Sequence, residues 1–208
     1  MYLRDMGARH MGWVAAAVAL SALMAGTAFA DPQAFSLEEG GTVRFRCRGP
    51  GIQHPAEGRF STVTSRLELD PSDLTTVSGE VQVLMVSITT VDSGWDVMFR
   101  RAPFLAIGEF PRARFVVTGV EGATALVSGR WTPLRILGDF TIHGVTKPQA
   151  IDALVYWDAA TKRLRLRAVT EMTWADHDID MPDGHTRVFA GDRAALLISL
   201  DYLGPRGR

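Results

Sequence analysis

The densest group of chemically active side chains in this sequence is a run of aspartates and histidines between residues 176 and 185. Carboxylates and imidazoles ligate divalent metals, and a histidine beside a carboxylate can transfer protons in hydrolysis. The spacing matches neither the HExxH zinc motif nor an EF-hand loop, and Pro182 and Gly184 are typical of a solvated loop. We keep a metal-binding or hydrolytic loop as an alternative function, and we assign no metal ligand and no catalytic residue. The side chains concerned are Asp176, His177, Asp178, Asp180, Asp183 and His185.

Two other polar positions have a structural and a functional interpretation. Asp96 and Arg100 are four residues apart, so on a helix they would form an ion pair. Alternatively, the guanidinium of Arg100 could bind a diphosphate or carboxylate head group. His143 precedes Gly144 in a predicted tight turn, and we interpret it as a turn residue rather than as an acid or base.

Composition and missing motifs exclude several classes of protein. The net charge of −1 disfavours general affinity for nucleic acid. The sequence has no GxSxG, no Walker loop, no GxGxxG after a strand and no CxxC, so hydrolase, nucleotide-dependent and dithiol chemistry have no local support. The single cysteine, Cys47, cannot form an intramolecular disulfide, and we interpret it as a buried apolar residue. We therefore expect no enzyme and no cofactor.

The N-terminus indicates export. Arg4 and Arg9 precede an uncharged stretch from 13 to 30, which ends in the small-residue pattern Ala28-Phe29-Ala30. A basic start, an apolar middle and such an end are typical of a secretory signal peptide. We predict that residues 1–30 are a signal peptide and that 31–208 form one domain in the periplasm or outside the cell. An uncleaved anchor is the alternative; no later stretch is long enough to span a membrane.

Alternation of apolar and polar residues dominates the rest of the chain. Period two predicts half-buried strands, and turn residues separate the segments. Many short antiparallel strands predict a closed barrel, because closure removes exposed edges. The predicted strands are Thr42–Arg48, Ser65–Leu69, Gly79–Ile88, Arg114–Val120, Ala123–Ser128, Arg135–Ile142, Ala150–Trp157, Arg163–Thr170 and Ala194–Tyr202.

One segment departs from this alternation. Between residues 95 and 106, apolar residues recur at steps of three and four, which predicts a short helix. Pro103 should break it, because proline cannot occupy an undisturbed helix interior. A short apolar helix in an all-β protein could close one end of the barrel. The barrel itself could enclose a ligand cavity or be packed solid, because alternation marks burial and not vacancy.

Two segments resemble the signatures of YceI-like proteins. The first is Val91–Phe115, VDSGWDVMFRRAPFLAIGEFPRARF, and the second is Gly138–Pro148, GDFTIHGVTKP. With the step Gly58-Arg59-Phe60, the resemblance extends from Thr42 to Tyr202. Met98 occupies a position where the family often carries a histidine, which makes the expected site less polar.

The resemblance implies an extended, lipocalin-like antiparallel barrel of about eight strands with a short helical insert. It also implies an apolar cavity for a long-chain amphiphile, most simply a polyisoprenoid or an isoprenoid quinone, with no established catalytic residues. Some relatives are dimeric, so a homodimer is one of the expected oligomeric states. The remaining alternative is a barrel with a fully packed interior, which would act through its outer surface as a stress protein or a protein-interaction module. The predicted ligand-binding residues are Phe45, Val86, Ile88, Trp95, Met98, Phe99, Arg100, Phe104, Leu105, Phe115, Leu166 and Ile198.

Overall fold

The computed structural model describes residues 31–50, 52–180 and 190–205. The predicted signal peptide, and residues 181–185 of the aspartate and histidine run, lie outside the described residues. Within the described ranges, no helix is long and apolar enough to cross a membrane.

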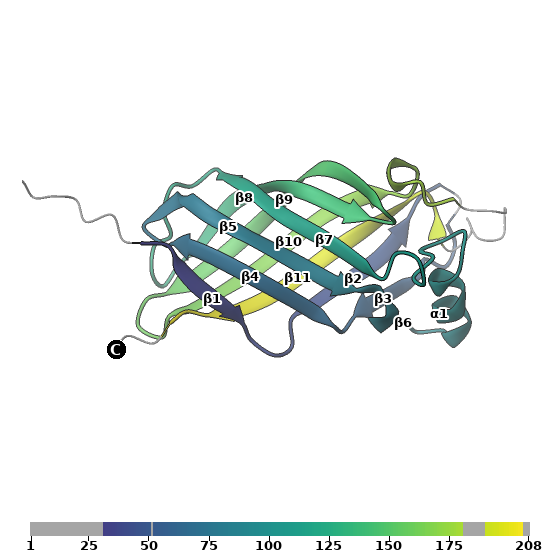
Figure 1. Ribbon diagram of the computed structural model, residues 1–208, viewed down its shortest axis with the longest axis horizontal. Helices are drawn as coiled ribbons and strands as arrows, with labels where there is room; N and C mark the ends of the chain where they lie inside the picture. The colour runs from purple at the N-terminus through teal and green to yellow at the C-terminus, as the bar shows by residue number, and fades with distance from the viewer. Residues whose placement is uncertain (1–30, 51, 181–189, 206–208) are drawn as a thin grey trace, which may run out of the picture.

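Across the described residues, eleven strands form one sheet (Figure 1). Strands β8, β9 and β10 pair antiparallel through short turns, as expected for half-buried strands of period two. The strands are β1 (Gln33–Leu37), β2 (Thr42–Arg48), β3 (Glu57–Phe60), β4 (Val63–Asp70), β5 (Asp73–Leu84), β6 (Ile88–Thr90), β7 (Arg112–Glu121), β8 (Trp131–Ile142), β9 (Val145–Asp158), β10 (Arg163–Thr173) and β11 (Arg193–Leu203).

The sheet closes into a barrel because β1 pairs with both β4 and β11. The closed ring runs β1-β4-β5-β7-β8-β9-β10-β11 and contains eight strands. Strand β11 pairs with β1 at its C-terminal end and with β2 over Arg193–Ser199, so β2, β3 and β6 extend the wall on one side. The predicted all-β antiparallel barrel with a helical insert is confirmed.

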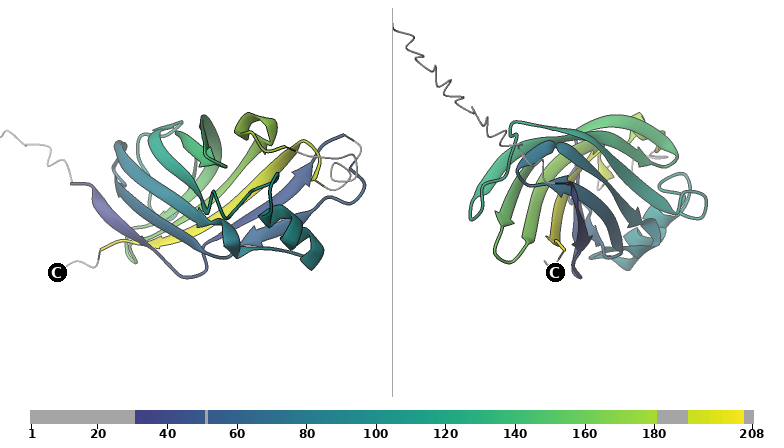
Figure 2. Two further views of the ribbon diagram at one scale, coloured as in Figure 1. Left: turned by 45° about the vertical axis from the view of Figure 1, so that its right-hand side comes forward. Right: turned by 60° about the vertical axis from the view of Figure 1, so that its left-hand side comes forward.

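The insert begins with helix α1 (Ser93–Arg100). The Asp92 side chain caps it by accepting a hydrogen bond of 2.7 Å from the backbone N–H of Gly94. The helix ends before Pro103, as predicted, and turns lead on to β7. In Figure 1 and in the left view of Figure 2, α1 lies at the end of the barrel away from the C-terminus.

Two strand predictions were wrong. Residues 123–128 form turns rather than a strand, and only Ser128 makes a bridge, to Trp157. The predicted strand Gly79–Ile88 is interrupted, because Met85–Ser87 form a 3₁₀ turn, η1, between β5 and β6. This turn breaks the alternation, so Val86 points outward and is 53% exposed instead of facing the lumen.

The buried apolar side chains form two clusters along the barrel. The helix-end cluster fills the α1 end, where Phe99 contacts Phe45 and Phe104 at ring-centroid distances of 5.5 and 5.4 Å. The far-end cluster lies toward the opposite end, where Phe35 and Trp157 meet edge to face at 5.7 Å. The α1 end of the barrel is therefore filled, which leaves the part surrounded by the far-end cluster as the place for a lumen.

Candidate ligand-binding site

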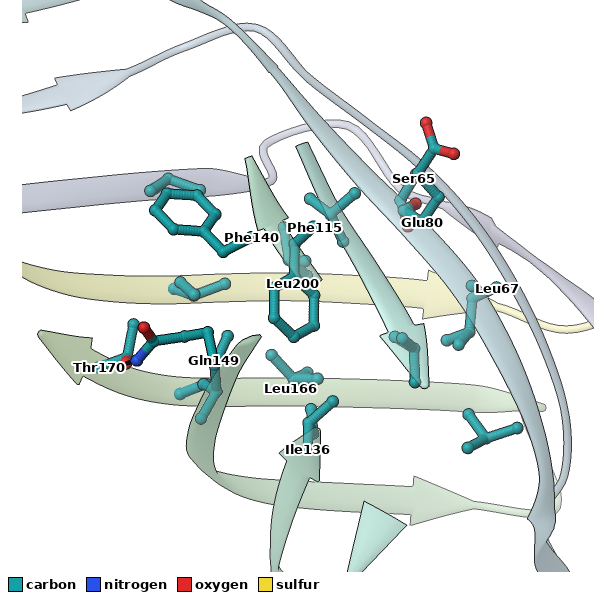
Figure 3. Close-up of a pocket in the computed structure, with 18 of the residues that line it drawn as sticks. Ser65, Leu67, Glu80, Phe115, Ile136, Phe140, Gln149, Leu166, Thr170 and Leu200 are labelled. Carbon is teal, nitrogen blue, oxygen red and sulfur yellow. Dashed lines mark hydrogen bonds between the residues drawn. The ribbon is translucent and has the colours of Figure 1, made fainter. Parts of the chain in front are cut away.

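An apolar lumen lies within the barrel beyond the helix-end cluster, and most buried residues of the far-end cluster form part of its wall. The centre of a water molecule can reach about 140 Å³ of it. Alternate residues of the ring strands face inward and line it (Figure 3), among them Leu67, Val81, Phe115, Ile136, Phe140, Leu166, Ile198 and Leu200.

The few polar side chains of the lumen are already hydrogen-bonded. The Ser65 hydroxyl donates to the Glu80 carbonyl oxygen at 3.0 Å and lies 3.0 Å from the Tyr202 hydroxyl. Burial raises the pKa of Tyr202 to about 12, so its hydroxyl keeps its proton at physiological pH. On the other side of the lumen, the Gln149 amide donates to the Thr170 hydroxyl at 2.6 Å. A lumen of this kind favours an apolar chain, because few polar groups there lack a partner.

Comparison with known families decides the relationship of this chain. The model of the YceI-like domain matches residues 36–202. The chain belongs to the YceI-like family. Two relatives are UPF0312 proteins, one from Pseudomonas fluorescens that is 31% identical over 96 residues and one from Shewanella oneidensis that is 35% identical over 98 residues. These matches cover 46% of this chain, which spans about half the length of the curated relatives, 48% and 47%.

Solved structures share the YceI-like fold at low sequence identity. Burkholderia cenocepacia BcnA has a TM-score of 0.64 at 14% identity, covering 77% of this chain and 94% of its own. A polyisoprenoid binding domain from Saccharophagus degradans has a TM-score of 0.62 at 14% identity, covering 83% and 99%. The Campylobacter jejuni YceI protein has a TM-score of 0.59 at 17% identity, covering 72% and 85%.

In this YceI-like protein the twelve predicted ligand-binding residues fall into three groups. Phe115, Leu166 and Ile198 line the lumen. Val86 lies outside the barrel, so its predicted place in the lumen is wrong. The others belong to the α1 end, where they fill the barrel or pack against its core: Phe45, Ile88, Trp95, Met98, Phe99, Arg100, Phe104 and Leu105.

The motif around α1 therefore builds a plug in this YceI-like protein. Phe99 is 1% exposed, and Phe104 and Leu105 are buried beside it. Arg100 lies 4.0 Å from Asp96 and donates a 2.7 Å hydrogen bond to the Ile88 carbonyl oxygen. The predicted ion pair with Asp96 is confirmed, and the hydrogen bond to Ile88 ties α1 to β6.

The histidines have structural positions. His143 occupies the two-residue β8–β9 turn, where it and Gly144 both adopt positive φ, 53° and 77°. The ring of Phe110 packs at 4.4 Å from His143, whose Nδ1 is buried with no hydrogen-bond partner among the described residues. The predicted turn position of His143 is correct.

The aspartate and histidine run is split in this YceI-like protein by burial. His177 is buried and its Nδ1 donates to the Val145 carbonyl oxygen at 3.2 Å, whereas Asp178 and Asp180 are exposed. Within the described ranges, no group of three or more His, Cys, Asp or Glu side chains is arranged to hold a metal ion. His185 and Asp183 lie outside those ranges.

Several lumen residues escaped the sequence analysis although their strands were predicted. Leu67 on β4, Val81 on β5, and Ile136 and Phe140 on β8 lie at alternate positions facing inward. The alternation of apolar and polar residues identified their inward-facing side. It does not show which inward-facing residues border an unfilled space. The family motifs drew attention to the α1 end instead, where the barrel is filled.

Proposed function

We propose that this protein binds the apolar chain of a long-chain amphiphile, a polyisoprenoid or an isoprenoid quinone, inside the barrel. The observation that carries this proposal is the unfilled apolar lumen, which lies beyond the helix-end cluster and is lined largely by the far-end cluster. An enclosed apolar space in a barrel of this size suits one chain-like ligand. The solved neighbour described as a polyisoprenoid binding domain supports the same class of ligand.

Export to the periplasm is the second part of the proposal. It is supported by the basic, apolar and small-residue pattern of residues 1–30. A chain-binding protein in an aqueous compartment would shield its ligand from water during transfer. Burial of ten methylenes contributes roughly 8 kcal/mol before the cost of association is subtracted.

The test combines native lipid analysis with a variant that fills the lumen. Protein purified from its native host is extracted and the extract is analysed by mass spectrometry, where we expect a prenyl lipid or quinone. Leu166→Trp places a large ring in the lumen and should abolish recovery of the lipid. Leu154→Trp is the matched control, because Leu154 is 47% exposed on the outside of β9.

Two results would overturn the proposal. One is repeated extraction without lipid, together with no binding of added polyprenol. The other is equal lipid recovery from the lumen variant and the control, both shown to be folded by circular dichroism.

A further inference from the structure

The wall of the barrel splits between β9 and β10. The two strands pair over Asp152–Asp158 and Arg163–Val169. Beyond this point, β9 continues on β8 down to Val145, and β10 continues on β11 to Thr173, but in the described residues the two are not paired with each other. A split in a sheet leaves edge N–H and C=O groups without a ladder partner.

The side chain of Gln149 bridges this split. Its Nε2 donates to the Thr170 hydroxyl at 2.6 Å and lies 3.3 Å from the carbonyl oxygens of Ala150 and Glu171. The Thr170 hydroxyl in turn lies 3.4 Å from the Ala150 carbonyl oxygen. In Figure 3 the Gln149 and Thr170 side chains point toward each other at the edge of the lumen. The side chains of Gln149 and Thr170 thus join β9 and β10 at a point where the two backbones are not hydrogen-bonded to each other.

The split separates the lumen from a hollow on the outside. The centre of a water molecule can reach about 400 Å³ of this outer hollow, and Gln149 and Met172 line both spaces. Its far side is closed by the 3₁₀ turn η2 (Ala175–His177), which is held by the hydrogen bond from His177 to the Val145 carbonyl oxygen. An apolar space and a polar space therefore meet at one pair of hydrogen-bonded side chains.

The charges around the outer hollow balance. Two cations, Lys147 and Arg193, face two carboxylates, Glu171 and Asp176. Arg193 lies 3.9 Å from Glu171 and 3.1 Å from Asp192, and the Thr173 hydroxyl is hydrogen-bonded to Asp176. A balanced set of charges gives no net attraction to a phosphate or diphosphate. The Gln149 amide nitrogen already donates to Thr170, so an uncharged head would donate to the Gln149 amide oxygen or replace the bond between the two side chains.

We infer that the split between β9 and β10 is the head-group site and the passage into the lumen. The ligand class is an amphiphile with an uncharged hydroxyl or carbonyl head, which lies against Gln149 and Thr170 while its chain fills the lumen. This inference rests on the proposed binding function and adds where the head lies and what charge it carries.

Three prenyl compounds with the same chain test the inference: farnesene without a polar head, farnesol, and farnesyl diphosphate. Dissociation constants are measured by displacement of a fluorescent polyene fatty acid. For the unmodified protein we expect farnesol to bind more tightly than farnesene, and the diphosphate to bind no more tightly than farnesol. Gln149→Leu, which keeps the volume and removes the amide, should weaken farnesol roughly fivefold to tenfold and leave farnesene unchanged.

Matched controls separate the head-group role from a structural one. Gln82→Leu changes a glutamine on the outer side of β5 and should leave all three dissociation constants unchanged. Thr170→Val removes the partner hydroxyl with nearly constant volume and should reproduce the effect of Gln149→Leu. Thermal unfolding of each variant shows that it is folded.

The outcomes are distinct. Equal weakening of farnesol and farnesene in Gln149→Leu would overturn the head-group site, because it would show loss of barrel structure alone. Tenfold tighter binding of the diphosphate than of farnesol would overturn the uncharged head. Failure of all three compounds to bind the unmodified protein would instead overturn the proposed function itself.

Discussion

His177 couples the stability of the β9–β10 region to pH. Its side chain is 2% exposed and packs edge to face on Phe140 at 5.3 Å. Burial lowers the pKa of His177 below its ordinary value of 6.5, although the hydrogen bond to the Val145 carbonyl oxygen opposes the shift. The folded protein therefore holds this imidazole neutral at a pH where the unfolded chain already binds a proton.

The free energy of unfolding should consequently fall as the pH drops below about 6.5, and the fall should end once the folded pKa is passed. Urea denaturation at a series of pH values from neutral to mildly acidic measures this slope. His177→Gln keeps a hydrogen-bond donor but does not titrate, so its slope should be smaller. Identical slopes for the two proteins would show that His177 does not contribute.

The sequence predicted which way a single side chain faces wherever its strand alternates apolar and polar residues without interruption. Phe115 and Leu166 could be placed in the lumen because β7 and β10 alternate through them. Val86 could not, because the turn η1 shifts which side it faces. The role of Gln149 could not be predicted either. It depends on the point at which β9 and β10 stop pairing, and the sequence around Gln149 does not show that point.

The β7–β8 pair packs so closely at Gly138 that a side chain has no room. A Cβ atom there would lie 2.4 Å from both the Phe115 ring and the Val116 carbonyl oxygen. Because one of these neighbours is backbone, the strands would have to separate, and Phe115 would move within the lumen. Close approach of this kind is a common reason for glycine inside a strand.

Gly138→Ala should therefore lower the free energy of unfolding by about 1–3 kcal/mol, as overpacking does in other cores. Gly119→Ala on the neighbouring β7 is the matched control, because a Cβ atom there meets nothing within 4 Å. Urea denaturation of both variants measures the difference. Equal stability of the two would mean that the strands adjust at no cost.

Predicted elements succeeded where alternation ran for several residues and failed where it was short. The long strands β8 to β11 were found, but β8 begins four residues and β9 five residues before the predicted start. The short strands β1 and β3 carry too few residues for a period to be visible, and both depend on partners distant in sequence. Residues 123–128 alternate without becoming a strand, because the chain turns there between β7 and β8.

Closure of the barrel and the emptiness of its lumen are properties of the whole molecule. Closure depends on the pairing of Ser36 with Leu203 and of Leu37 with Tyr202, residues at opposite ends of the domain. The void depends on how far the side chains of eight strands reach toward one another, which apolar alternation does not express. The resemblance to YceI-like proteins pointed to a cavity, while the three-dimensional structure shows which part of the barrel keeps it.

Because the helix-end cluster fills one end of the barrel, the volume of the lumen limits the chain that can enter. Each methylene that enters should contribute about 0.8 kcal/mol, or roughly a fourfold gain in affinity. The gain should stop when the lumen is full. Further methylenes must then remain in water or in the outer hollow beside Gln149, where they gain much less.

A series of straight-chain alcohols should therefore show affinity that rises steadily with chain length and then levels off once the lumen is full. Competition with a fluorescent fatty acid gives the dissociation constants, and the rise in melting temperature with each bound alcohol provides an independent scale. Phe99→Ala removes a large ring from the helix-end cluster, so it should move the plateau to longer chains while lowering stability by about 3–5 kcal/mol. A plateau that stays in place in Phe99→Ala would show that α1 does not close the lumen. Affinity that keeps rising at the same rate with length would show that the chain is not enclosed, since only a closed space stops adding contacts.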